Sequence, residues 1–63
     1  MTDNPEDAVL RHMAAAIAGV RRADDLRVMG RPAPGDTGPY LPMDMRAARA
    51  ALAAYRAHAS ASH

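Results

Sequence analysis

The sequence predicts an all-α chain, with two helices joined by a long loop rich in proline and glycine. Three observations predict it. Sixteen of the 63 residues are alanine, the best helix former, and they lie mostly in two blocks, at 8–23 and 47–61. Apolar residues recur at helical spacing in both blocks. Between the blocks, residues 30–42 contain four prolines and three glycines, which excludes regular secondary structure there.

The first helix is predicted at residues 5–23. Asn4 can cap its N-terminus, Pro5 suits the first helical position, and Asp7 places negative charge where the helix dipole favours it. The larger apolar residues follow one face in steps of three and four, which is the spacing of an amphipathic helix: Leu10, Met13, Ile17 and Val20.

Residues 24–29 leave two alternatives open. They can extend the first helix to a stop at Gly30, or they can form a separate turn capped by Asp24. The apolar face of the first helix would next need an apolar residue at position 24, where the sequence has an aspartate. We therefore favour a break or bend near Ala23.

The second helix is predicted at residues 42–58, with Pro42 as its first residue and the tail 59–63 fraying. One face carries Met45, Ala48, Leu52, Tyr55 and Ala59. A separate face carries only small residues, namely Ala47, Ala50, Ala54 and Ala57. Two such faces indicate neighbours on two sides, one in the same chain and one in another. The alternative is that alanine simply fills exposed helical positions.

A chain of this size and composition forms one small helical domain, residues 1–63, with a thin core. It has no cysteine, phenylalanine or tryptophan, and below roughly 70–80 residues a lone core seldom supplies more than ~3–5 kcal/mol. We therefore expect association, as an antiparallel hairpin in a dimeric four-helix bundle or as two helices splayed over a larger protein. The predicted interface consists of Leu10, Met13, Ile17, Val20, Tyr40, Leu41, Met45, Leu52 and Tyr55.

Charge and hydropathy exclude several classes of function. The eight basic residues are all arginine and face seven acidic residues, so a net charge of +1 gives no general attraction to nucleic acid. Arginine without lysine is typical of a high-GC bacterial or phage genome. The N-terminus is acidic and no apolar run approaches the ~18 residues of a membrane span. We expect a cytoplasmic protein with no membrane partner.

No pattern of residues indicates an enzyme, a metal site or a cofactor. The three histidines, His12, His58 and His63, lack metal-binding spacing, and the paired carboxylates at 6–7 and 24–25 are better explained by helix starts and turns. No glycine-rich phosphate loop or nucleophile motif is present. We expect no catalytic residue, no metal and no cofactor in this chain.

Two short segments carry a family resemblance. The run 10–14, followed by Ile17 and Ala18, resembles the first helix of the small delta subunit of soluble formate dehydrogenases, and Met45-Arg46 resembles a later segment of that family. The resemblance covers generic helix, and the tryptophan-containing motif expected before the later segment is absent. We infer no membership from it, only that small accessory subunits have sequences of this kind.

The sequence thus favours a non-enzymatic accessory or interaction protein that associates through its alanine-rich helices. Its partner would be a second copy, or a larger protein of which it is a small subunit, including an enzyme. The alternative is a small dimeric DNA-binding regulator, because Arg46, Arg49 and Arg56 share one face of the second helix and could contact phosphates.

Overall fold

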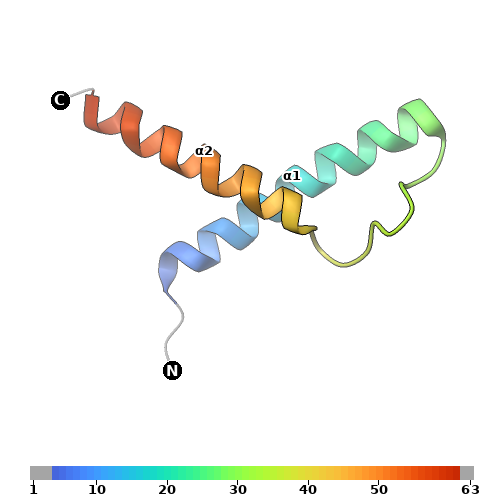
Figure 1. The fold of residues 1–63 in the computed structure, drawn as a ribbon, viewed down its shortest axis with the longest axis horizontal. Helices are drawn as coiled ribbons and strands as arrows, with labels where there is room; N and C mark the ends of the chain where they lie inside the picture. Colours follow the sequence, from blue (N-terminus) through green and yellow to red (C-terminus); the bar gives the residue numbers. More distant parts are fainter. Residues whose placement is uncertain (1–3, 62–63) are drawn as a thin grey trace.

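The computed structural model describes residues 4–61, which contain two α-helices and no strand. Helix α1 spans Pro5–Met29 and helix α2 spans Pro42–Ala61. Figure 1 shows that the two helices cross, with the first half of α2 lying over the middle of α1 and the loop returning along one side. The molecule is correspondingly flat, measuring 45 × 33 × 12 Å. The predicted all-α class and the helix–loop–helix arrangement are confirmed.

Helix α1 begins as predicted. The side-chain oxygen of Asn4 accepts a hydrogen bond from the backbone N–H of Glu6 at 2.9 Å, and Pro5 is the first helical residue. This interaction satisfies one of the N–H groups that a helix leaves without a partner in its first turn.

The predicted end of the first helix near Ala23 is wrong, because α1 continues to Met29. It ends at Gly30, whose φ of 74° is left-handed and whose N–H donates to the carbonyl of Leu26 at 2.9 Å. Asp24 does not break the helix, since its position is exposed and its carboxylate pairs with Arg27 one turn later. The prediction assumed that the apolar face stays covered along the whole helix, whereas α2 crosses it only once.

Helix α2 begins at Pro42 as predicted and extends beyond residue 58. Residues 59–61, which the sequence predicted to fray, are helical, while 62–63 lie outside the described residues. At the start of α2, the carboxylate of Asp44 accepts the backbone N–H of Leu41 at 2.7 Å. An acidic residue at the third helical position that bonds back to the capping residue is one half of a capping box.

The core lies where the helices cross. Leu10, Ala14 and Ala48 form a buried cluster, and Ala18 is buried beside it. Because three of these four residues are alanines, the helix backbones can approach closely, but little apolar area is covered. Partly buried residues surround the cluster: Met13, Ile17, Tyr40, Met45 and Leu52. Within residues 4–61, neither helix is long and apolar enough to cross a membrane.

Candidate interaction surface

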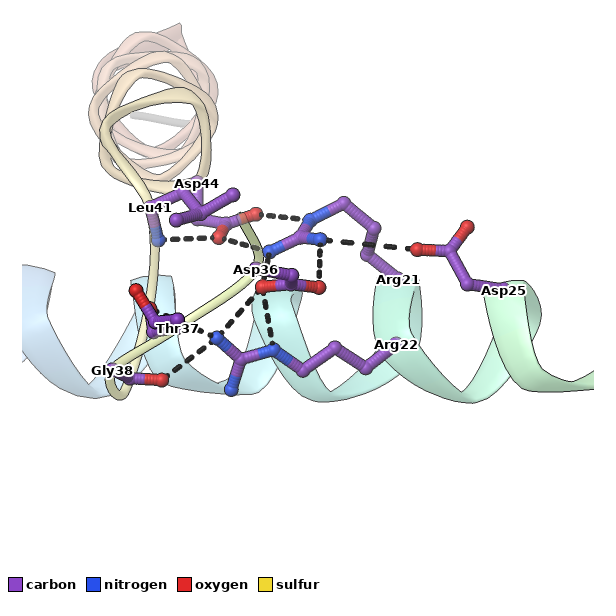
Figure 2. A network of polar contacts seen from close by, with 8 residues as sticks. All are labelled: Arg21, Arg22, Asp25, Asp36, Thr37, Gly38, Leu41 and Asp44. Atoms are coloured by element: carbon purple, nitrogen blue, oxygen red, sulfur yellow. Dashed lines mark hydrogen bonds and ion pairs between the residues drawn. The ribbon is translucent and has the colours of Figure 1, made fainter. Parts of the chain in front are cut away.

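A cluster of charged side chains connects the three segments of the chain around Arg21 (Figure 2). From α1, Arg21 donates to Asp44 at the start of α2, through Nε at 3.0 Å and Nη2 at 2.7 Å. The same guanidinium donates to Asp36 in the loop, through Nη1 at 2.6 Å and Nη2 at 3.2 Å. One arginine therefore makes a two-bond contact with each of two carboxylates, the strongest geometry that this side chain offers.

Arg22 holds the loop from the other side. Its Nε donates to Asp36 at 2.9 Å, and its Nη2 donates to the backbone carbonyl of Gly38 at 2.7 Å. The side chain of Asp36 is completely enclosed by these partners, with an exposed fraction of 0%. We refer to Arg21, Arg22, Asp36 and Asp44 as the charge clamp.

The charge clamp shifts the pKa values of its members. Hydrogen bonds from Arg21 and Arg22 lower the pKa of Asp36 to about 2. The hydrogen bonds from Arg21 and from the Leu41 backbone lower the pKa of Asp44. The two carboxylates in turn raise the pKa of Arg21. All of these shifts favour the ionised form, so the clamp stays charged at neutral pH.

This geometry fits a structural role and not a chemical one. The clamp carboxylates accept hydrogen bonds from guanidinium groups and so are poor candidates for taking a proton from a substrate. Among residues 4–61, no group of three or more histidine, cysteine, aspartate or glutamate side chains is placed to hold a metal ion. His12 and His58 lie on exposed helix surfaces, and His63 is outside the described residues.

The sequence analysis did not predict the charge clamp. The missed signal is the helical phase: Arg21 follows Ala18 on the core face of α1, and Asp44 precedes Ala48 on the core face of α2. Opposite charges on two core faces predict an ion pair between them.

The structure places the nine predicted interface residues in two groups. Leu10 is buried, and six others are partly buried near the crossing: Met13, Ile17, Tyr40, Leu41, Met45 and Leu52. Val20 is 74% exposed because it lies on the face of α1 that is turned away from α2, and Tyr55 is 69% exposed because α2 extends away from α1 beyond the crossing. The described chain therefore uses most of this set for its own core and leaves two members free for contact.

An apolar stripe on α1 is left largely uncovered, with Met13 as the one member that also packs partly against the core. Its residues are spaced in steps of four, three, four and three, and we call them the outer seam: Val9, Met13, Ala16, Val20 and Ala23. At ~100° per residue, the outer seam lies about 140° around α1 from the face that contacts α2. A shallow hollow of about 530 Å³ along it is lined by Ala16, Ile17, Val20, Arg21 and Asp24. A second hollow, of about 390 Å³, continues past Val20 to Arg27.

The arginines proposed to contact phosphate are exposed, but one of them has a partner. Arg56 forms an ion pair with Glu6 in the first turn of α1, and this contact lowers the pKa of Glu6. Both residues line a small cleft of about 150 Å³ between the diverging helices, together with Arg49. Arg46, Arg49 and Arg56 thus do not form a uniformly positive face, since an acidic residue lies among them.

Comparison of the chain with known protein families, with curated proteins and with solved structures finds no match. The function is therefore inferred from the charge clamp and the outer seam.

Proposed function

We propose that this chain is a small non-enzymatic interaction protein, which completes its fold by covering the outer seam of α1 with another protein. One observation carries the proposal. Within residues 4–61 the buried apolar residues are one leucine and three alanines, whereas seven large apolar residues are exposed: Val9, Val20, Leu26, Val28, Met29, Met43 and Tyr55. A chain that exposes more large apolar side chains than it buries gains from a partner.

The magnitudes support association. Full burial of a valine, leucine or methionine side chain contributes about 1.5–3 kcal/mol, and an alanine contributes much less. Covering Val9 and Val20 alone would contribute as much as burying Leu10 does. A partner on the outer seam would therefore add a stabilisation comparable to that of Leu10, the one large apolar side chain that the described chain buries fully.

The charge clamp supports the same proposal, because it fixes the scaffold that presents the seam. Arg21 joins α1 to Asp36 in the loop and to Asp44 in α2, so the two helices keep their relative orientation. A partner that binds only this arrangement of the helices stabilises it further. Met13 in the seam adds a side chain that adapts to an irregular partner surface.

The test is the behaviour of the purified full chain, followed by light scattering during size exclusion and by far-ultraviolet circular dichroism on the same fractions. We expect either a helical oligomer or a monomer with little helix. Both results would mean that a single chain does not form a complete core by itself. A helical monomer that unfolds cooperatively, at a midpoint independent of protein concentration, would contradict the proposal.

A further inference from the structure

We propose that the occupant of the outer seam is a second copy of this chain, with the two α1 helices packed antiparallel about a two-fold axis. This inference rests on the proposed function and specifies its partner. It identifies Val9, Met13, Ala16, Val20 and Ala23 of both copies as the contact residues, with the axis between Ala16 and Val20.

The spacing of the seam identifies a helix as its occupant. Steps of four, three, four and three are the heptad spacing, in which apolar residues stay aligned with a neighbouring helix. Along the seam from Val9 to Ala23 no member is charged or polar. An exposed helix face of this kind is complementary to another helix face of the same period.

The sizes of the seam residues fit an antiparallel copy of themselves. With the axis between Ala16 and Val20, Val20 of each copy lies opposite Ala16 of the other. In the same register, Met13 of each copy lies opposite Ala23 of the other. Val20 and Met13 therefore each meet an alanine, which lets these facing layers interdigitate without voids or overlap.

The charges at the two ends of α1 favour the antiparallel direction. The first turn is acidic, with Glu6 and Asp7, whereas the last turn carries Arg27. Arg27 continues the seam four residues after Ala23, and its side chain is 79% exposed beside Asp24. In this register Arg27 of one copy lies opposite Val9 of the other, so its alkyl stem can cover Val9 while its guanidinium reaches toward Glu6, which also pairs with Arg56. A parallel pair would instead place the two Arg27 side chains together.

Helix α2 leaves this surface accessible. The fully buried α1 residues, Leu10, Ala14 and Ala18, lie on a different face from the outer seam, of which Met13 alone also packs partly against the core. Figure 1 shows α2 crossing α1 once and then extending away from it. A second copy can therefore bind while the charge clamp and the helix crossing stay intact.

A pair of matched variants tests the proposal. Val20→Arg places a charge beside the two-fold axis, whereas Val28→Arg places it on the same helix about 100° around from the seam. The wild-type valines are 74% and 75% exposed, and each new arginine would lie four residues from Asp24. We expect the wild type and Val28→Arg to be helical dimers, and Val20→Arg to dimerise at least about tenfold more weakly.

A distance measurement keeps the direction of packing testable even if Val20→Arg is poorly folded. The chain has no cysteine, so Val28→Cys gives a single site for a spin label. In the antiparallel dimer the two labelled positions lie roughly 30 Å apart along the helix axis, since α-helices rise 1.5 Å per residue. In a parallel dimer they would lie level with each other, and that result would overturn the proposal.

The remaining outcomes separate this inference from the proposed function. If the purified chain is a monomer with little helix, the partner is not a second copy. The proposed function would still stand, with a different protein as the partner. If Val20→Arg and Val28→Arg weaken dimerisation equally, the outer seam is not the dimer interface, although the chain still associates with itself. A stable helical monomer would overturn both proposals.

Discussion

Arg21 on α1 donates two hydrogen bonds to Asp44 on α2, at 3.0 and 2.7 Å, and this contact joins the two helices next to their crossing. Asp44 has an exposed side-chain fraction of only 2% and also accepts the backbone N–H of Leu41. The Asp44 carboxylate therefore caps the N-terminus of α2 and also attaches α2 to α1.

Replacing this carboxylate is expected to destabilise the chain strongly. Asp44→Asn keeps the size of the side chain but removes its charge. In either orientation of the new amide, its NH₂ group faces an N–H donor of Arg21 or of Leu41. An enclosed donor is then left without an acceptor. The matched control is Glu6→Gln, which removes the charge from a second carboxylate that joins α1 to α2. That carboxylate is 41% exposed, so solvent screens its ion pair with Arg56.

Thermal unfolding followed by circular dichroism compares the two variants. We expect Asp44→Asn to lower the midpoint much further than Glu6→Gln does. Equal effects would show that enclosure of the Arg21–Asp44 contact adds nothing to its strength.

Stability is expected to fall in acid through Asp36. Its pKa is lowered from 3.8 to about 2 in the folded chain, so the folded state binds this proton less readily than the unfolded chain does. The stabilisation is fully present above the unfolded pKa, and it is lost as pH falls from about 4 to about 2. Denaturant unfolding should show that the free energy of unfolding of the wild type declines over this pH range, and that the decline is smaller in Asp36→Asn. If the free energy of unfolding of both proteins has the same pH dependence, Asp36 is not the source of the decline.

Local features of the sequence predicted the helices well, because they depend on neighbouring residues. Asn4 and Pro5 mark the start of α1, and Pro42 marks the start of α2, as the structure confirms. The end of α1 was missed because the phase argument at Asp24 assumed a neighbouring helix along its whole length. The crossing angle of two helices depends on side-chain packing, which periodicity alone does not give.

The charge clamp was missed because its partners are distant in sequence. Arg21 lies 15 residues from Asp36 and 23 from Asp44, and the loop between them has no periodicity from which its path could be predicted. The outer seam was partly visible, since Val20 was assigned to an interface. Its full extent depends on which face of α1 the crossing helix leaves uncovered.

Leu10 is expected to be the most sensitive apolar position. It is 4% exposed and packs with Ala14 and Ala48, so truncation to alanine removes the largest member of the buried cluster. Leucine-to-alanine changes in cores cost about 2–5 kcal/mol, which approaches the whole stability of a domain of this size. Leu10→Ala should therefore abolish the cooperative transition, whereas Leu26→Ala, at a position 50% exposed, should retain it. Retention of the transition in Leu10→Ala would contradict this placement of the core.

Substitution of alanine for glycine is expected to have opposite effects inside α1 and at the residue that ends it. At Gly19, inside the helix, an added Cβ meets nothing within 4 Å in the chain, and alanine favours a helix interior by about 1 kcal/mol over glycine. At Gly30 the space is also open, but φ is +74°, and a left-handed backbone costs a residue with a side chain about 1–2 kcal/mol. Gly19→Ala should raise the free energy of unfolding, and Gly30→Ala should lower it. Both are measured in the wild-type background at one protein concentration, so that association contributes equally to each comparison. A loss of stability in Gly19→Ala would mean that this side of α1 is covered, contrary to the described surface.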